Sequence, residues 1–109
     1  MKVLSLFDGI SCGMLALQRA GIPVECYDAF EIDKYAVTVS KRNFPVIVHH
    51  GNVYDGDFTK FKGYDLLLGG SPCTYWSIAI KDREVDCNGE GFRLFKEYVR
   101  ALHESGCRY

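Results

Sequence analysis

Four short apolar runs separated by polar segments constrain this chain of 109 residues more than any other feature. The runs cover residues 3–7, 24–30, 46–50 and 66–68. Strands that alternate with helices in this way predict a doubly wound, Rossmann-like α/β sheet of parallel strands. We expect the strand order 3-2-1-4, with the architecture stopping after about four strands. The chain would reverse direction between strands 1 and 4, and ligands bind beyond the carboxyl ends of strands at such a switch point.

The polar segments between and after these runs have helical character. Ser11 is a residue type that caps helices, so we expect it to cap the first helix with its side chain. A second helix is predicted over residues 34–43, with Tyr35 and Val39 facing inward and Ala36 as a further candidate for that face. A third is predicted over residues 93–104, where apolar residues recur at helical spacing.

The composition, with 48% apolar and 25% charged residues, is that of a globular domain and argues against disordered, fibrous and membrane-spanning classes. The five Cys form no C-x-x-C pair and no secretory signal precedes them, which favours reduced thiols in a cytoplasm over disulfides or structural zinc. His49 and His50 are adjacent and would point to opposite faces of a strand, so they predict no metal site. The net charge of −1 lacks the basic signature of many nucleic-acid-binding proteins.

Two loops meet at the predicted switch point, and the first has the features of a ligand-binding loop. Residues 7–13, FDGISCG, contain glycines and lead into a helix N-terminus, so their backbone can approach a ligand closely. Glu31 ends the second strand about 20 residues later, the spacing at which an acid hydrogen-bonds ribose hydroxyls. Alone, each feature also fits a plain turn or a solvated carboxylate. Together they favour an adenosine-type cofactor, although the Walker and three-glycine dinucleotide patterns are both unmet.

The second loop, GGSPC at residues 69–73, brings a thiol to the same edge of the sheet. Free cysteine is usually a small buried hydrophobe, and Cys26 and Cys107 fit that role. Cys73 differs because the surrounding Gly and Pro residues hold it in a rigid loop at the switch point. A thiolate in that place can act as a nucleophile.

Taken in order, the segments FDGISCG, YDAFEID, GNV and GGSPC, followed by LFKEYVR, resemble the motifs of cytosine-C5 DNA methyltransferases, above all those of phages and bacteria. The resemblance extends from the first strand to the last helix, and GGSPC is its most specific element. It implies that residues 1–109 are the N-terminal part of a catalytic domain that uses S-adenosylmethionine (SAM) and acts on DNA, without the target-recognition domain.

The resemblance also implies a role for each residue that matches a motif. Cys73 would attack C6 of a flipped-out cytosine, and C5 of the resulting covalent adduct would accept the methyl group. Glu31 would hold the ribose hydroxyls of SAM, and Asn52 would stand at the edge of its adenine. For the apolar positions ordinary core packing is the alternative. The remaining implied cofactor contacts are Phe7, Asp8, Gly9, Ile10, Ser11, Cys12, Ile32, Val53, Pro72 and Leu94.

The sequence departs from the family pattern in several places. Asn52 stands where the family usually has an acid, and Thr74 follows the cysteine where many relatives carry Gln. The family's Glu-Asn-Val motif, its arginine-bearing motif near the base and its late segment that closes the cofactor pocket do not occur. We therefore expect the isolated chain to be an incomplete, inactive part of the enzyme.

Two other functions remain open at this point: a non-catalytic SAM-binding module, and one subunit of a split methyltransferase. An NAD oxidoreductase is disfavoured by the glycine pattern. The expected partners are double-stranded DNA and a missing C-terminal portion or complementary subunit. A homodimer through the exposed edge of the strand at residues 66–68 is also expected, because unpaired sheet edges tend to pair.

Overall fold

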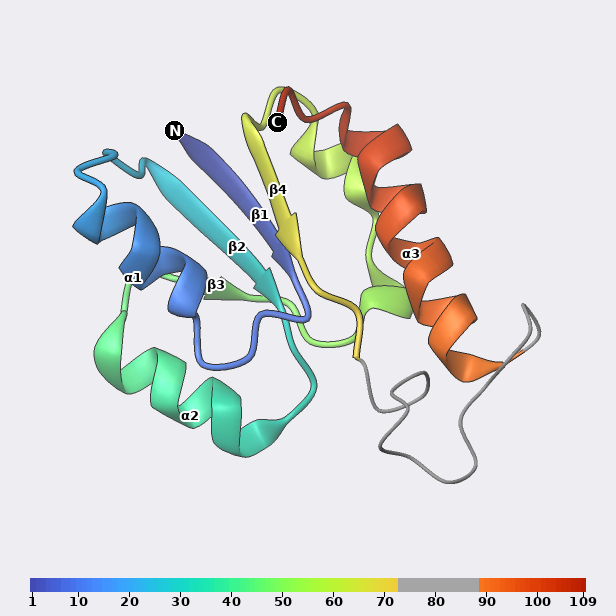
Figure 1. Cartoon of the computed structure of the whole chain (residues 1–109), viewed down its shortest axis with the longest axis horizontal. Coiled ribbons are helices and arrows are strands. Elements are labelled where there is room, and N and C mark those ends of the chain that lie inside the picture. Colours follow the sequence, from blue (N-terminus) through green and yellow to red (C-terminus); the bar gives the residue numbers. More distant parts are fainter. Residues whose placement is uncertain (73–88) are drawn as a thin grey trace.

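The computed structural model describes residues 1–72 and 89–109. Its centre is a four-stranded sheet built from β1 (Lys2–Leu6), β2 (Cys26–Phe30), β3 (Val48–His49) and β4 (Leu66–Gly69). The strands lie in the order β3-β2-β1-β4, and each neighbouring pair is parallel (Figure 1). The predicted fold class and strand order are therefore confirmed.

Helices cover both faces of the sheet. One face carries α1 (Cys12–Arg19) and α2 (Lys34–Asn43), and the other carries α3 (Glu90–Ser105) with two short 3₁₀ helices (Figure 1). The 3₁₀ helices are η1 (Val53–Asp55) and η2 (Phe58–Phe61). The chain runs outward from β1 to β3 and then returns to pair β4 with the other side of β1. This reversal is the predicted switch point, where Leu6 pairs with Gly69.

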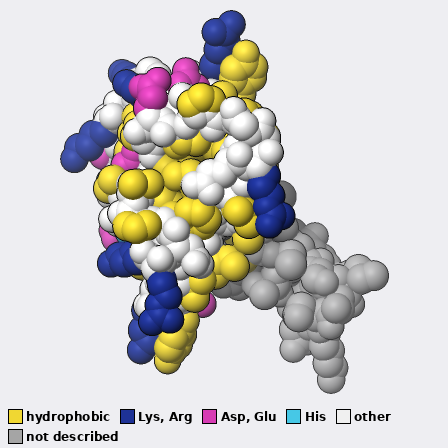
Figure 2. All heavy atoms as spheres, turned by 90° about the vertical axis from the view of Figure 1, so that its left-hand side faces the viewer, with side chains coloured by type: hydrophobic (Ala, Val, Ile, Leu, Met, Phe, Trp, Pro, Cys, Tyr) yellow, Lys and Arg dark blue, Asp and Glu magenta, His cyan; other side chains and the backbone are white. Residues whose placement is uncertain are grey.

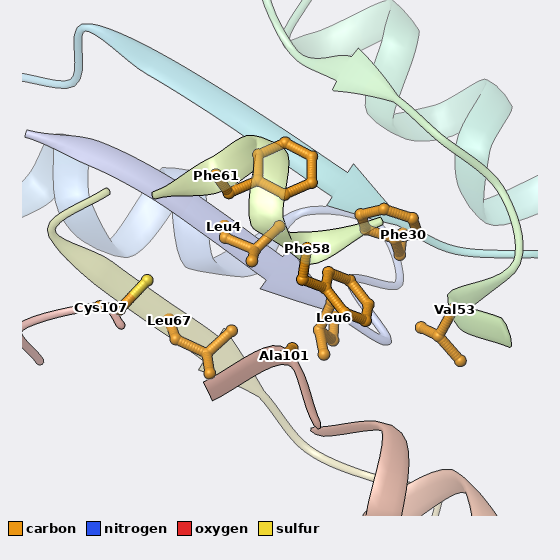
Figure 3. Close-up of a cluster of buried hydrophobic side chains, with 9 residues drawn as sticks. All are labelled: Leu4, Leu6, Phe30, Val53, Phe58, Phe61, Leu67, Ala101 and Cys107. Atoms are coloured by element: carbon orange, nitrogen blue, oxygen red, sulfur yellow. The ribbon is translucent and has the colours of Figure 1, made fainter. Parts of the chain in front are cut away.

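Alternating side chains of β1 enter two separate hydrophobic cores. Leu4 and Leu6 belong to the core beneath α3 and η2, which contains the fully buried ring of Phe58 (Figure 3). Val3 belongs to the core beneath α1, together with Met14. Full burial of a side chain of this kind stabilises a fold by roughly 1.5–3 kcal/mol, so β1 is anchored from both sides.

Helix α2 has the predicted bounds, but its inward-facing residues differ from the prediction. The Asp33 carboxylate caps the helix by accepting hydrogen bonds from the backbone amides of Tyr35 at 2.9 Å and Ala36 at 3.4 Å. Tyr35 is 73% exposed and Val39 is 40% exposed, whereas Ser40 is fully buried. The prediction of an inward Tyr35 and Val39 is wrong because β3 has only two residues, which leaves α2 little sheet to cover.

The prediction that Ser11 caps α1 with its side chain is also wrong. Ser11 has a left-handed φ of 69° and makes no side-chain capping bond to the helix. Its buried hydroxyl instead donates to the carboxylate of Asp8 and lies 2.5 Å from the hydroxyl of Ser40. The loop before α1 is therefore held by buried polar contacts rather than by an N-cap.

The outer edge of β4 is partly paired. The amide of Tyr109 donates to the carbonyl of Asp65, and the amide of Leu67 donates to the carbonyl of Tyr109, both at 2.9 Å. This exchange is the hydrogen-bond pattern of a parallel bridge. The expectation that residues 66–68 lack a backbone partner on that side is therefore wrong for Leu67.

Two further features concern residues 1–72 and 89–109. No helix in this part of the chain is long and apolar enough to cross a membrane. The same residues contain no group of three or more His, Cys, Asp or Glu that could hold a metal ion.

Candidate functional site

A cleft with a volume of about 230 Å³ opens beyond the carboxyl ends of β1 and β2. Its walls come from the loop after β1, the end of β2, the segment around η1, the loop after β4 and the first turns of α3. The lining residues are Phe7, Phe30, Glu31, Ile32, Gly51, Asn52, Val53, Tyr54, Pro72, Glu90 and Leu94. The site thus lies where the strand order reverses, as the topology of open α/β sheets leads one to expect.

The structure brings most of the predicted cofactor contacts together in this cleft. The predicted residues among its lining are Phe7, Glu31, Ile32, Asn52, Val53, Pro72 and Leu94. Four further residues that the sequence reasoning missed are Phe30, Gly51, Tyr54 and Glu90. Tyr54 directly follows the predicted pair at 52–53, but no signal pointed to Glu90, which begins a helix remote in sequence. Cys73 lies outside the described residues.

The Glu31 carboxylate is fixed by backbone amides on both of its oxygens. Oε1 accepts a hydrogen bond from the amide of Gly9 at 2.8 Å. Oε2 accepts from the amides of Ile32 and Asp33 at 3.0 Å each. Each carboxylate oxygen has two lone pairs, so the group still has acceptor capacity for a ligand. Glu31 is half-buried and therefore presents an oriented carboxylate to the cleft.

The loop after β1 has an unusual backbone that buried polar contacts support. Phe7, Gly9 and Ser11 all have left-handed φ values, of 55°, 61° and 69°. Such values are uncommon for residues other than Gly, so surrounding contacts must hold them. The supporting group is Asp8, whose carboxylate turns inward and accepts hydrogen bonds from the hydroxyls of Ser5 and Tyr27, both at 2.7 Å, and from that of Ser11. Asp8 therefore shapes the loop and does not line the cleft.

Burial dominates the electrostatics around Asp8. Tyr27 is 1% exposed, and burial raises the pKa of its hydroxyl well above the ordinary value, with the nearby Asp8 carboxylate adding to the rise. The Tyr27 hydroxyl therefore stays protonated and continues to donate to Asp8. Ionisation of Tyr27 therefore does not remove this hydrogen bond in mildly alkaline solution.

The structure separates the rest of the predicted loop from the cleft. Ile10, Ser11 and Cys12 line a second hollow of about 380 Å³, together with Leu15 of α1 and the end of α2. Apolar side chains gather on the face of the molecule that carries α1 and α2 (Figure 2). The exposed Ile10 and Leu15 belong to this hollow. In the described residues, only Phe7 of residues 7–12 therefore lines the first cleft.

A hydrogen bond joins two segments of the cleft lining that are remote in sequence. The hydroxyl of Tyr54, which lies in η1, donates to Oε1 of Glu90 at the start of α3, at 2.6 Å. Partial desolvation and the Glu90 carboxylate raise the pKa of Tyr54 to about 12, so the phenol remains a donor at neutral pH. On the same wall, Oδ1 of Asn52 accepts from the amide of Tyr54 at 2.9 Å and caps η1. The rim therefore combines a carboxylate, a phenol and an amide.

Arg100 supports this wall from behind. Its guanidinium donates to the backbone carbonyls of Val53 at 3.0 Å and Gly56 at 2.9 Å. It also pairs with Glu97 at 2.6 Å and lies over the ring of Phe58, 4.5 Å from its centroid. A planar guanidinium can satisfy several acceptors at once, so this one side chain fixes η1 against α3.

A second polar cluster lies in the core behind Phe30. The buried carboxylate of Asp28 accepts from the Tyr64 hydroxyl and lies 2.7 Å from Nε2 of His50. The His50 ring stacks on Phe30 with centroids 5.0 Å apart. Burial and the Asp28 carboxylate raise the pKa of Tyr64 far above its ordinary value. This cluster satisfies the buried carboxylate and holds Phe30, one wall of the cleft.

The fold is shared with solved methyltransferase structures. A DNMT2 mutant from Spodoptera frugiperda matches with a TM-score of 0.64 and 20% identity, covering 95% of this chain and 41% of that chain. A TehB-like SAM-dependent methyltransferase from Corynebacterium glutamicum matches with a TM-score of 0.56 and 15% identity, covering 95% of this chain and 48% of that one. Together with the strand order and the position of the cleft, these matches define a Rossmann-like fold of the methyltransferase type.

The family follows from the sequence. The family model for C-5 cytosine-specific DNA methylase matches residues 1–108, so the chain belongs to that family. The predicted resemblance is therefore confirmed.

Individual relatives agree with this assignment. The chain is 36% identical to the orphan methyltransferase M.Rho11sI of Bacillus phage rho11s over 112 residues, covering 100% of this chain and 22% of that protein. It is 33% identical to the DNA (cytosine-5)-methyltransferase DRM2 of Arabidopsis thaliana over 115 residues, covering 94% of this chain and 18% of that protein. The chain thus spans less than a quarter of the length of these two relatives.

Proposed function

We propose that this chain forms the cofactor-binding and nucleophile-bearing part of a DNA (cytosine-5-)-methyltransferase, which transfers a methyl group from SAM to C5 of cytosine. The observation that carries the proposal is the oriented Glu31 carboxylate in an apolar cleft at the switch point of a chain that belongs to this family. SAM-dependent relatives of the same fold support the choice of cofactor.

The chemistry of the lining suits an adenosine-containing cation. Phe7, Ile32 and Leu94 offer apolar surfaces against which a purine can pack. Glu31 offers acceptor capacity for ribose hydroxyls, as acidic residues at the end of a second strand do in related folds. Among the described lining residues there is no Lys, Arg or His, while Glu31 and Glu90 carry negative charge. The cleft therefore favours a ligand with a positive centre, such as a sulfonium.

When bound, SAM supplies an electrophilic methyl group. The proposed role of this chain in the reaction is the addition of the Cys73 thiolate to C6 of cytosine, which makes C5 nucleophilic. Pro72 lines the cleft, and Cys73 is the next residue in the sequence. This adjacency in sequence supports the proposal that the thiol acts close to the bound cofactor. The target carbon is inaccessible in a duplex, so the base must leave the stack, as is general for methyltransferases.

The proposed partners are double-stranded DNA and further polypeptide that completes the enzyme. The parallel bridge between Tyr109 and β4 supports the second of these, because it occupies the place of a next parallel strand. A homodimer through the rest of the β4 edge remains a proposal. Analytical ultracentrifugation tests it, and a chain that stays monomeric at all concentrations contradicts it.

The experiment that tests the cofactor is calorimetric titration of the chain with SAM and with S-adenosylhomocysteine. We expect both molecules to bind. If neither molecule binds at millimolar concentration, the proposal is contradicted. Glu25→Gln, an isosteric loss of charge at a surface residue that pairs with the N-terminal amine, is the matched control and should bind like the unaltered chain.

The experiment that tests the nucleophile uses this chain together with the further polypeptide that we propose completes the enzyme, supplied in the same chain or in trans. Transfer of labelled methyl groups from SAM to duplex DNA should be abolished by Cys73→Ser, because a hydroxyl is far less ionised than a thiol. The chain of residues 1–109 alone should show no transfer. Methylation by the Cys73→Ser protein would contradict the proposal that Cys73 is the nucleophile. Methylation by residues 1–109 alone would contradict the proposal that this chain needs further polypeptide for activity.

A further inference from the structure

We propose that Glu90 reads the base of the cofactor, by accepting a hydrogen bond from the exocyclic amine of adenine while the Asn52 amide donates to ring nitrogen N1. The inference rests on the proposed function and deepens it. Neither motif spacing nor strand position pointed to Glu90, which enters the cleft from the first turn of α3.

The two ends of the cleft have different chemistry, which fixes the direction of a bound nucleoside. Glu31 receives the amide of Gly9, so the loop after β1 lies beside the carboxylate proposed to hold the ribose. Asn52, Tyr54 and Glu90 form the other polar group of the lining. When the ribose is held at Glu31, the amino-acid part of the ligand points towards the loop after β1. The adenine then points towards Asn52, Tyr54 and Glu90.

Asn52 presents a donor to the cleft. Its side-chain carbonyl oxygen accepts from the amide of Tyr54 at 2.9 Å, which orients the whole carboxamide. The side-chain nitrogen has no hydrogen-bond partner among the described residues. Because this nitrogen can only donate, Asn52 suits a ring nitrogen with a lone pair.

Glu90 presents an acceptor to the same part of the cleft. Its Oε1 accepts from the Tyr54 hydroxyl at 2.6 Å, and its Oε2 lies 3.8 Å from the guanidinium of Arg93, which is 67% exposed. The short bond to Tyr54 orients the carboxylate, and the long ion pair with Arg93 leaves Oε2 accessible. Lone pairs therefore remain on both oxygens for a donor from the ligand.

This donor and acceptor match one purine edge. The edge of adenine offers an amine donor beside the lone pair of N1, which complements Glu90 and Asn52. Hypoxanthine has the reverse pattern, with a carbonyl oxygen that repels a carboxylate and an N1–H that opposes the amide. The site should therefore prefer adenine to hypoxanthine in an otherwise identical ligand.

The test is calorimetric titration of the whole chain with S-adenosylhomocysteine and S-inosylhomocysteine, which differ only in this edge of the base. The unaltered chain should bind the adenosine compound more tightly. Glu90→Gln should lower that preference by about tenfold or more, the value of a hydrogen bond to a charged group. Gln can also donate to the carbonyl of hypoxanthine, so the inosine compound should gain affinity in absolute terms.

Controls separate recognition from structure. Glu25→Gln should leave both affinities unchanged, and Tyr54→Phe should reduce the preference for adenine by loosening Glu90 while keeping its charge. If Glu90→Gln weakens both compounds by the same factor, Glu90 is only structural and the inference is overturned. If the unaltered chain binds neither compound, the proposed function fails with it, whereas binding without discrimination overturns the inference alone.

Discussion

The amide of Gly9 donates to Oε1 of Glu31 at 2.8 Å and so ties the loop after β1 to the end of β2. The two residues belong to different motifs, yet one hydrogen bond makes them a single unit of the site. Glu31 consequently has two tasks, because the same carboxylate that faces the cleft also holds the left-handed backbone at Gly9.

The first prediction follows from these two tasks. Glu31→Gln should weaken binding of S-adenosylhomocysteine by about 1–3 kcal/mol, because a carboxamide retains only one accepting oxygen. Its NH₂ group would also face the amide of Gly9 or the amides of residues 32 and 33, which are donors themselves. Calorimetry measures the change against Glu25→Gln, and an unchanged affinity would show that Glu31 does not hold the ribose.

A second prediction concerns the half-buried carboxylate of Asp8. Asp8→Ala removes the acceptor of the buried Tyr27 hydroxyl, and an unpaired buried donor costs about 1–3 kcal/mol. Tyr27→Phe should cost less, because the serines at 5 and 11 still donate to Asp8. Urea unfolding of the two single variants and the double variant gives their coupling energy. Strict additivity of the two free energies would mean that the hydrogen bond contributes nothing.

The third prediction is a pH dependence of stability from His49. Burial, followed by the charge of Lys41, lowers the pKa of this imidazole below 6.5, and its buried Nδ1 has no partner among the described residues. The folded state therefore favours the neutral ring, so the stabilisation is present above pH 6.5 and is lost as pH falls below it. The slope contributed by one such group is at most about 1.4 kcal/mol per pH unit.

Urea unfolding between pH 5 and 8, an interval chosen around the ordinary histidine value, measures this slope. His49→Gln should flatten the dependence, because glutamine does not titrate. His103→Gln, at an exposed residue near the end of α3, is the control and should keep the slope of the unaltered chain. An identical slope in the His49 variant would assign the dependence to other groups.

The sequence predicted those parts of the site that come directly after an apolar run, because such a run in this chain forms a buried strand and places the next residue at the edge of the sheet. Glu31 ends an apolar run, so it had to stand at the carboxyl edge of β2 beside the loop that follows β1. Asn52 and Val53 follow the next strand in the same way. Parallel strands bring their carboxyl ends to one edge, which is why positions far apart in the sequence could be expected in one cleft.

The parts that the sequence did not predict depend on contacts between remote segments. Glu90 reaches the cleft because α3 packs on η1 through Arg100. The hydrophobic periodicity of the sequence does not predict which segments pack together in this way. Ser11 is a residue type that caps helices, but the half-buried Asp8 carboxylate accepts the hydrogen bond from its hydroxyl instead. Tyr35 follows the helical pattern of α2 yet stays exposed, because the length of β3 decides how much of that helix is covered.

The last prediction uses the two adjacent glycines that end β4 and begin the loop leading to Cys73. A Cβ at Gly69 would lie 2.6 Å from Cε2 of Tyr98 and 3.2 Å from the carbonyl oxygen of Leu6, whereas a Cβ at Gly70 would have no atom of the described residues within 4 Å. Gly69→Ala should therefore lower the free energy of unfolding by about 1–3 kcal/mol through overpacking, because the ring must move away from β4. Gly70→Ala should change it by less than about 0.5 kcal/mol, as substitutions into open space do. Urea unfolding of the two variants makes the comparison within one loop and one type of substitution. Equal destabilisation would mean that the close packing of α3 on the end of β4 does not limit this position, and that the need for glycine there lies in the backbone alone.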